Sequence, residues 1–459
     1  MTKPAAYPDS SFLESILTPE SSVFPLAGFD SWFEERMASH HFTIEQIPFS
    51  ALRNWSFSEE TGNLGHASGK FFTIEGIEVE TNFGGIPQWR QPIINQPEIG
   101  FLGFITKKFN GVLHFLFQAK MEPGNIRCIQ LGPTLQATKS NYTRVHKGNP
   151  PPFLEYFQDT ESRKVLVDVL QSEQGGRFLR KRNRNIVIEL GEDVNLAENR
   201  DYIWLTLGQA QQLLRRDNVI NMDARTVLSC LPYHRHMHTH GEVTPNLHTF
   251  DQILTWFTEL KCRYDLNVRS IPLNQATPWQ RDEFSIHHPS GNYFEVIAVR
   301  VEADVREVPE WTQPIIRPCH EGLIAFVMRE VDGELHFLVQ AKVEAGNFDV
   351  VEMAPTVQCL TGDYRKAQKE QRPPFVEHVL NARPEDILFD SLQSEEGGRF
   401  FREENRNVIL RWSPDFPADI PDNYIWISYT QIKELIRFNN ILNIQARCLL
   451  SAVVPPGGV

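Results

Sequence analysis

Short apolar runs of the length expected for β-strands recur along the chain in two similar series. In each series two runs flank a polar dipeptide, Asn110-Gly111 in the first series and Asp332-Gly333 in the second. Both dipeptides suit a type I′ turn, because the two central residues of that turn need positive φ. The pattern therefore predicts β-hairpins that join Ile99–Ile105 to Val112–Gln118 and Leu323–Met328 to Leu335–Gln340.

Each series contains further strands and ends in two helical stretches. A helix is expected near the start of each series, with Asp30 as the cap of Ser31–Ala38 and Asp251 as the cap of Gln252–Cys262. The closing helices follow capping-box patterns, at Thr206 with Gln209 and at Ser428 with Gln431. The expected fold is α+β with an antiparallel-rich sheet, present twice. Its further strands are predicted at Ile126–Leu131, Val165–Leu170, Ile186–Leu190, Phe348–Met353, Ile387–Leu392 and Val408–Trp412.

The two series are copies of one domain. Residues 171–185 read QSEQGGRFLRKRNRN and residues 393–407 read QSEEGGRFFREENRN, at an offset of 222 residues (393 − 171). The same offset links two WxQPII stretches, two QAKxExGN stretches and two PTxQ stretches. A period this long is that of a domain and not of a solenoid unit. We expect a first repeat at 1–231, a linker at 232–246 and a second repeat at 247–459, each closing its own apolar core.

Composition narrows the class of protein. The net charge of −13 argues against a nucleic-acid-binding chain, because phosphate neutralisation needs a basic face. The chain has no run of eighteen apolar residues, and its first residues lack the pattern of a secretory signal. Its six cysteines form no CxxC pair, as expected for reduced thiols. We therefore expect a cytoplasmic protein that does not enter a membrane.

Polar residues shared by both copies are more informative than shared apolar ones. One interpretation is a buried hydrogen-bond and salt-bridge network that supports the Gly-Gly bend of each QSExGGRF block. The other is an anion pocket, because arginine grips phosphate bidentately and glycine lets backbone N–H groups approach a ligand. The shared groups are Glu173, Arg177, Arg180, Asn183, Arg184 and Asn185, which recur as Glu395, Arg399, Arg402, Asn405, Arg406 and Asn407.

A polar loop that follows each PTxQ stretch differs between the copies. At the 222-residue offset Tyr142 aligns with Tyr364, whereas His146 aligns with Gln368 and Ser140-Asn141 aligns with Gly362-Asp363. Such divergence is expected where duplicated domains differ in function, and ordinary surface drift is the alternative. Tryptophans that could stack on a nucleobase, or belong to the core, are Trp55, Trp89, Trp279 and Trp311.

Several chemistries lack their sequence motifs. The chain contains no GxGxxG after a strand, no GxxxxGK[ST], no GxSxG and no HExxH. Four alternating histidines between the copies could form a metal patch, but the segment lies between the domains and has no counterpart in the second copy. We therefore expect no metal site and no cofactor. These histidines are His234, His236, His238 and His240.

The duplicated blocks resemble the NDP-hexose 2,3-dehydratase family of deoxysugar biosynthesis over almost the whole chain. The blocks are WxQPII, QAKxExGN, PTxQ, PPF and QSExGGRF, each present twice in one order. The resemblance implies a homodimer of tandem Nudix-like domains without the Glu-rich metal helix of Nudix hydrolases. It implies elimination of water across C2 and C3 of dTDP-4-keto-6-deoxy-D-glucose. It also implies that an NADPH-dependent 3-ketoreductase consumes the 3,4-diketo product, and that one of the duplicated pockets is active.

This reaction needs a base for the C3 proton, a donor for the O4 enolate and an acid for the departing C2 hydroxyl. The candidates for base or acid are Tyr142, His146, Tyr364, Glu173 and Glu395, with Lys120 and Lys342 beside them. A nucleotide-sugar binding protein without chemistry and a divergent Nudix hydrolase remain alternatives. The candidates for substrate binding are Trp55, Trp89, Trp311, Ser140, Asn141, Thr143, Arg144, Ser172, Arg177, Ser394, Arg399, Asn405, Arg406 and Asn407.

Overall fold

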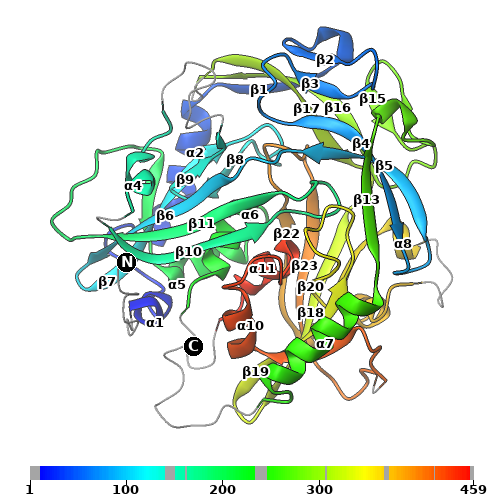
Figure 1. Ribbon diagram of the computed structural model, residues 1–459. Helices are drawn as coiled ribbons and strands as arrows, with labels where there is room; N and C mark the ends of the chain where they lie inside the picture. Colours follow the sequence, from blue (N-terminus) through cyan, green and yellow to red (C-terminus); the bar gives the residue numbers. More distant parts are fainter. Residues whose placement is uncertain are drawn as a thin grey trace.

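A computed structural model describes residues 11–139, 150–160, 163–232, 246–304, 308–365, 372–417 and 419–454. Within these residues the chain forms two seven-stranded and two five-stranded sheets (Figure 1). Most strand pairs are antiparallel, which confirms the expected α+β class with antiparallel-rich sheets. None of the helices in the described ranges is long and apolar enough to cross a bilayer.

The first large sheet belongs to the first repeat. Its order is β10-β11-β6-β7-β12, with β8 paired to β7 and β9 paired to β6, and β11 runs parallel to β6. Asn110 and Gly111 join β6 to β7 with φ of 52° and 85°, as the predicted type I′ turn requires. The bounds are β6 Gly100–Phe109, β7 Val112–Met121, β8 Ile129–Gly132, β9 Leu135–Ala137, β10 Lys164–Ser172, β11 Arg182–Leu190 and β12 Tyr202–Leu205.

The second large sheet repeats this topology with the second copy. Its order is β20-β19-β18-β23-β22, with β21 paired to β18, β24 paired to β19, and β18 parallel to β23. Asp332 and Gly333 have φ of 49° and 85°, so the second hairpin prediction is also confirmed. The bounds are β18 Gly322–Val331, β19 Glu334–Lys342, β20 Glu352–Ala354, β21 Val357–Leu360, β22 Ile387–Ser394, β23 Glu404–Arg411 and β24 Tyr424–Ser428.

Two helices close each repeat, as predicted: α5 (Leu207–Leu214) and α6 (Met222–Ser229), then α10 (Tyr429–Leu435) and α11 (Ile444–Leu450). Both capping boxes form, since Thr206 and Ser428 accept from the backbone N–H of Gln209 and Gln431. The helices α6 and α11 pack on the two large sheets and contact each other between them (Figure 1).

The caps predicted for the two early helices are wrong. Helix α2 (Phe29–Ser39) begins after Gly28, which makes no side-chain cap bond, and Asp30 lies in its first turn. Helix α7 (Phe250–Arg263) begins after Thr249, whose hydroxyl accepts from the Gln252 N–H in a capping box. A threonine with glutamine three residues later outcompetes the aspartate because it satisfies two backbone donors at once.

Other short helices are α1 (Ser11–Ile16), α4 (Glu155–Gln158), α8 (Gly362–Arg365) and α9 (Val376–Leu380). Single 3₁₀ turns lie at Leu26–Gly28, Phe49–Ala51, Leu273–Gln275 and Pro384–Asp386.

The two small sheets exchange strands between the repeats, which the sequence pattern did not predict. Strand β1 of the first repeat pairs with β16 of the second, and β13 of the second repeat pairs with β4 of the first. The first sheet contains β1 (Phe42–Ile47), β14 (Gln280–Arg281), β15 (Ser285–His287), β16 (Phe294–Ala303) and β17 (Glu310–Pro318). The second contains β2 (Trp55–Phe57), β3 (Leu64–His66), β4 (Thr73–Thr81), β5 (Gln88–Asn95) and β13 (Leu266–Ile271).

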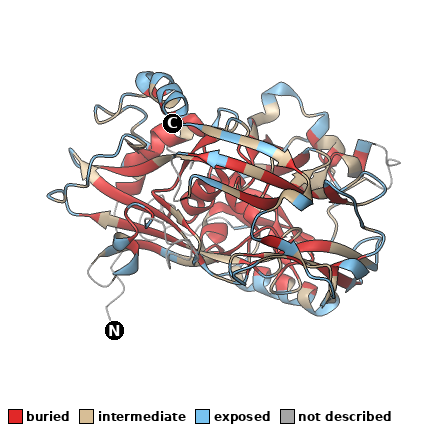
Figure 2. Ribbon diagram, turned by 90° about the horizontal axis from the view of Figure 1, so that it is seen from above, coloured by how far each residue is buried: buried red, intermediate tan, exposed pale blue. Residues whose placement is uncertain are grey.

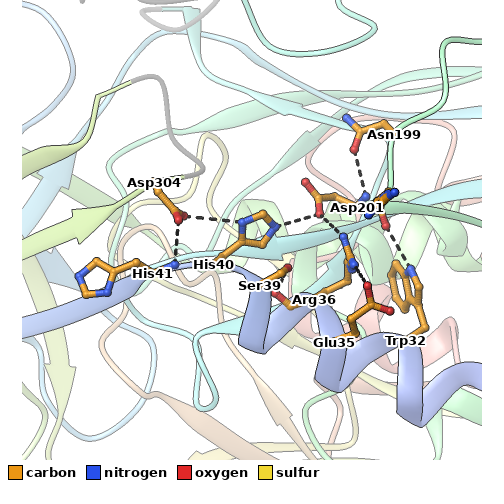
Figure 3. Close-up of polar contacts among 10 residues, drawn as sticks. Trp32, Glu35, Arg36, Ser39, His40, His41, Asn199, Asp201 and Asp304 are labelled. Atoms are coloured by element: carbon orange, nitrogen blue, oxygen red, sulfur yellow. Dashed lines mark hydrogen bonds and ion pairs between the residues drawn. The ribbon is translucent and has the colours of Figure 1, made fainter.

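Polar contacts hold the junction from which the exchanged strand β1 leaves its own repeat (Figure 3). His40 lies between Asp201 of the first repeat, 3.0 Å away, and Asp304 of the second, 3.6 Å away. The buried Arg36 lies 3.6 Å from Asp201, and the backbone N–H of His41 donates to Asp304 at 3.0 Å. These contacts join the end of α2 to both repeats at the point where the chain crosses over.

Each repeat is long enough to close its own core and each contains a hydrophobic cluster of its own, but the largest cluster is shared between them. The largest hydrophobic cluster includes Phe104, Phe115 and Leu213 of the first repeat together with Phe326 and Phe337 of the second. Buried segments accordingly run through the middle of the molecule, and exposed segments lie mainly on peripheral turns and helices (Figure 2). The shared cluster joins the two repeats into one packed unit, because apolar faces of both large sheets are buried in it.

Candidate active site

The QSExGGRF block of each repeat packs against the ExGN segment of the other. The N–H of Gly124 donates to Gly397 O and the N–H of Gly346 donates to Gly175 O, both at 2.6 Å. A Cβ added to Gly124 would lie 1.6 Å from the Phe400 carbonyl oxygen, and one added to Gly346 would lie 1.7 Å from that of Phe178. Only glycine fits there, so the repeated glycines serve the close approach of the two halves.

Two cavities lie at this interface and are related by the internal repeat. The larger has a volume of about 450 Å³ and the smaller about 180 Å³. Ligand pockets commonly span about 300–1,000 Å³, so only the larger of these two is of a size for a nucleotide sugar. Its inner wall comprises Gly100, Leu102, Lys120, Glu122, Gln136, Glu173, Phe178, Lys181, Asn183 and Asp223 of the first repeat, with Glu396, Gly398 and Arg399 of the second.

Buried carboxyl groups and lysines are concentrated at the inner end of the larger cavity. Glu122 accepts from Gln136 Nε2 at 2.8 Å, and Glu173 accepts from Asn183 Nδ2 at 2.6 Å. The second carboxylate oxygens of Glu122 and Glu173 have no hydrogen-bond partner among the described residues. Buried oxygens of this kind are costly unless a ligand meets them, so they mark a site for a polar ligand.

Burial shifts the pKa of several of these groups. Desolvation raises the pKa of Glu396 to about 8 against the opposing effect of Arg399, and Glu122 and Glu173 add to the rise. Desolvation also raises the pKa of Asp223 well above its usual range, and nearby Glu396 reinforces this. Groups whose pKa values are shifted toward neutrality are suited to general acid–base catalysis, because they can both accept and donate a proton at that pH.

The neighbouring pair Glu173 and Lys181 is shifted in the same way. Desolvation raises the pKa of Glu173, although the positive charge of Lys181 opposes the rise. Desolvation lowers the pKa of Lys181 to about 8, while Glu173 acts in the opposite direction. The Lys181 ammonium donates to the backbone oxygen of Glu98, which holds it at the cavity wall.

The outer end of the larger cavity is aromatic. Trp55 packs edge-on against His66 with ring centroids 5.3 Å apart and against Phe72 at 4.8 Å. Trp311 of β17 lines the same cavity from the second repeat. The Arg399 guanidinium lies 4.3 Å above the Phe72 ring and donates to Gln96 Oε1 at 3.2 Å.

The smaller cavity has its own hydrogen-bonded carboxyl groups. Glu395 accepts from both Gln174 and Asn405. Desolvation raises the pKa of Glu403 to about 7, and Arg177 opposes the rise. Arg177 lies over the Phe294 ring at 4.3 Å, as Arg399 does over Phe72. The remaining lining includes Lys342, Glu344 and Gln358, the counterparts of Lys120, Glu122 and Gln136.

The residues selected from the sequence fall into several places. Trp55, Trp311, Glu173 and Arg399 line the larger cavity, with the candidate Lys120. Arg177, Glu395, Asn405 and the candidate Lys342 line the smaller one.

Two predicted binding residues lie between the cavities in the interface. Ser172 donates to Glu352 at 2.8 Å, and its backbone oxygen accepts from Arg447. Ser394 exchanges hydrogen bonds with Gln130 at 2.7 and 2.9 Å. At these two positions the contacts are those of a buried polar network, the first of the two interpretations given for the QSExGGRF block.

Four other candidates, all within the described ranges, line neither cavity. Arg406 forms a bidentate pair with Asp390, at 3.0 and 2.6 Å. Asn407 donates to Asn405 O, and the Trp89 indole donates to Gln91 at 2.8 Å. Tyr364 is buried in a hydrophobic cluster of the second repeat, where desolvation raises its pKa.

Other predictions fall outside the described residues. These are Ser140, Asn141, Tyr142, Thr143, Arg144 and His146, and the histidines of the linker. Within the described residues, no group of three or more His, Cys, Asp or Glu side chains is arranged to hold a metal ion.

Sequence reasoning missed Glu122, Lys181, Asp223 and Glu396. Three of them differ from their counterparts at the 222-residue offset, where the chain has Glu403, Gln445 and Gln174. A search for identities between the copies passes over such positions. The useful signal was a charge change inside an otherwise matching block.

Comparison with known proteins agrees with this duplicated architecture. The chain is 45% identical to dTDP-4-dehydro-6-deoxy-alpha-D-glucopyranose 2,3-dehydratase of Saccharopolyspora spinosa, over 96% of this chain and 94% of that protein. It is 44% identical to the protein of the same name from Amycolatopsis orientalis (92% and 89%) and 45% identical to that from Streptomyces violaceoruber (93% and 96%). The sequence model of NDP-hexose 2,3-dehydratases matches residues 26–231 and again residues 250–453. The chain belongs to the NDP-hexose 2,3-dehydratase family.

Proposed function

We propose that this protein is a lyase that eliminates water across C2 and C3 of dTDP-4-keto-6-deoxy-D-glucose, and that the larger cavity is its active site. The observation that carries the proposal is one cavity with an aromatic end and a buried acid–base cluster. Relatives that share about 45% of this sequence over most of its length are named for that reaction.

The substrate itself supplies much of the activation. The C4 ketone makes the C3 proton acidic, so a single base of raised pKa can remove it. The electrons of the C3–H bond first form an enolate on O4, and then form the C2–C3 double bond as the C2 hydroxyl leaves with a proton from an acid. The resulting enol tautomerises to the 3,4-diketo sugar when C2 gains a proton and the C3 hydroxyl loses one.

The two ends of the larger cavity suit the two ends of a nucleotide sugar. Trp55 and Trp311 offer apolar faces on which a thymine can stack. Arg399 lines the same cavity and suits the diphosphate, because a guanidinium binds phosphate oxygens in pairs. The sugar then lies among Lys120, Glu173 and the other groups of the charged end.

Two candidates in the loop after β9, Tyr142 and His146, are also proposed to act at the larger cavity. Residue 139, the last one described before the loop, follows β9, whose Ala137 lines the larger cavity. Tyr142 and His146 are therefore proposed to reach the sugar from the first repeat. Tyr142→Phe should reduce exchange of the C3 proton into deuterated water, whereas Tyr364→Phe should not. Loss of exchange in the Tyr364 variant alone would move the chemistry to the second repeat.

The decisive experiment incubates the full chain with dTDP-4-keto-6-deoxy-D-glucose, NADPH and a 3-ketoreductase. Consumption of NADPH that depends on both proteins is expected. Release of TMP without NADPH consumption would indicate a hydrolase. Saturable binding without turnover would indicate a nucleotide-sugar binding protein, and both of these outcomes contradict the proposal.

The family resemblance also supports proposals about the compartment, the oligomeric state and the reductase partner of the enzyme. We propose a cytoplasmic homodimer of tandem Nudix-like domains whose unstable product passes to an NADPH-dependent 3-ketoreductase. Free cysteines at all six positions are compatible with a reducing compartment. Light scattering on a size-exclusion column tests the dimer, and a mass equal to one chain would contradict it.

A further inference from the structure

We propose that Glu396 and Asp223, one from each repeat, form the acid–base pair of the dehydration, with Glu396 as the base for C3–H and Asp223 as the acid for the C2 hydroxyl. The inference rests on the proposed function. It makes the active centre composite, because neither repeat contains both residues.

The two cavities identify the pair by comparison. Their inner walls share, at the 222-residue offset, a lysine, two glutamates, a glutamine, an asparagine, a phenylalanine, two glycines and an arginine. At two further positions the larger cavity carries carboxyl groups, Glu396 and Asp223, where the smaller carries the amides Gln174 and Gln445. An amide keeps the polarity of a carboxyl group but transfers no proton near neutral pH. Proton transfer is therefore what these two positions add to the larger cavity.

The two carboxyl groups come from separate elements that meet at the cavity. Asp223 lies in the first turn of α6, and Glu396 lies in the Gly-Gly bend of the second repeat. Both are buried. The charged groups that line the same inner end are Lys120, Glu122, Glu173, Lys181 and Arg399.

Two such carboxyl groups in one dry site do not ionise together. Like charges disfavour the second ionisation, so the reactive form of the pair is the singly ionised one, which holds one proton. The Coulomb effect of Glu396 is the largest charge contribution to the raised pKa of Asp223, after desolvation. One member is then ready to accept a proton and the other to donate one.

Local contacts assign the roles. Glu396 accepts the N–H of Gly398 at 3.1 Å and lies near Arg399, both of which stabilise its ionised form. The charges of three nearby carboxyl groups raise the pKa of Asp223 further, whereas the charge of Lys120 lowers it. Together with desolvation, this environment favours the protonated form of Asp223. Glu396 is thus assigned as the member that ionises first and acts as the base, and Asp223 as the member that stays protonated and acts as the acid.

The step balances with this assignment. The C3 proton passes to Glu396 and the C3–H electron pair moves toward C4 to form an enolate with its charge on O4. The enolate then returns its electrons to form the C2–C3 double bond and the C4 ketone, and the C2–O bond breaks as Asp223 protonates the departing hydroxide to give water. The pair begins and ends with one proton, now on Glu396. Return of that proton to C2 during ketonisation, with loss of the enol O–H proton to Asp223, restores the starting state.

The test compares E396Q and D223N with the matched control E403Q in the full chain. E403Q neutralises a buried glutamate of the smaller cavity and leaves the larger one untouched. Three quantities are measured: coupled turnover, exchange of the C3 proton into deuterated water, and affinity for dTDP. Circular dichroism melting checks the fold, and E396D replaces E396Q if that variant does not fold.

General acid–base catalysis contributes about 10²–10⁴-fold, so turnover of E396Q and D223N should fall by at least about a hundredfold. E396Q should also lose C3 exchange, whereas D223N should retain it, and both should bind dTDP as the wild type does. E403Q should match the wild type throughout. Turnover within about tenfold of the wild type in E396Q or D223N overturns the inference while the proposed function stands. Exchange lost in D223N and kept in E396Q contradicts the assigned roles. A wild type without turnover contradicts the proposed function itself.

Discussion

The two cavities share one ancestry and one wall pattern, yet they differ in size and in acid–base content. The larger encloses about 450 Å³ and the smaller about 180 Å³. Glu396, Asp223 and Lys181 of the larger correspond to Gln174, Gln445 and Glu403 of the smaller. Because the fold constrains both in the same way, their shared residues mark the architecture and their differences mark the chemistry.

Converting the larger cavity to the amide pattern of the smaller should have the largest effect. The double variant D223Q/E396Q should lose at least about a hundredfold in turnover and no more than E396Q alone, because residues that act as a unit are not additive. Coupled NADPH consumption measures it. Losses that multiply in the double variant would show that the two groups act independently.

The two equivalent arginines should differ in ligand binding. Arg399→Ala should weaken dTDP binding about ten- to a hundredfold, since a charge-assisted hydrogen bond contributes roughly 1.5–3 kcal/mol. Arg177→Ala serves as the matched control, because Arg177 lines the smaller cavity and lies over Phe294 as Arg399 lies over Phe72. Calorimetry with dTDP measures both. Equal loss in the two variants would indicate that both cavities bind nucleotide, and Arg→Lys versions replace either one that fails to fold.

The raised pKa of Glu396 predicts how stability changes with pH. Desolvation raises this pKa from 4.5 to about 8 in the folded chain, so the folded state binds more protons than the unfolded state between these values. Its contribution to stability is therefore lost as pH rises from about 4.5 to 8. E396Q should be more stable than the wild type at pH 8, with a flatter profile below it. Chemical denaturation at several pH values measures this, and an unchanged profile in E396Q would contradict the raised pKa of Glu396.

The smallest effect is expected from removal of divalent metal ions. If the carboxyl groups of the larger cavity move protons, EDTA-treated enzyme should keep its activity. Activity that is lost with EDTA and restored only by a divalent ion would make these carboxyl groups metal ligands instead. The same coupled assay, with the reductase checked separately in EDTA, gives the answer.

Local sequence signals predicted the large sheets well. The turns at Asn110-Gly111 and Asp332-Gly333 and the capping boxes at Thr206 and Ser428 depend on neighbouring residues alone, and all formed. The small sheets were missed because their pairing is distant in sequence. Strand β1 meets β16 more than two hundred residues later, as in the pairing of Phe42 with Ala303, and no local pattern encodes that partner.

The candidate site was predicted in part. Shared polarity selected Glu173 and Arg399, which line the larger cavity, but also Arg406, whose guanidinium pairs with Asp390. Asp223 and Glu396 escaped because their side chains meet only when the two repeats fold together, and because identity between copies was the criterion. Charge differences at matched positions are the better criterion once a duplication is known.

The most direct test of the central claim is exchange of the C3 proton into deuterated water, followed by NMR for E396Q and E403Q side by side. Each variant replaces one glutamate that lines a cavity by its amide, in the larger and the smaller cavity respectively. The account predicts that exchange disappears in E396Q and proceeds at the wild-type rate in E403Q. Exchange that persists in E396Q, or that disappears in E403Q, would contradict it.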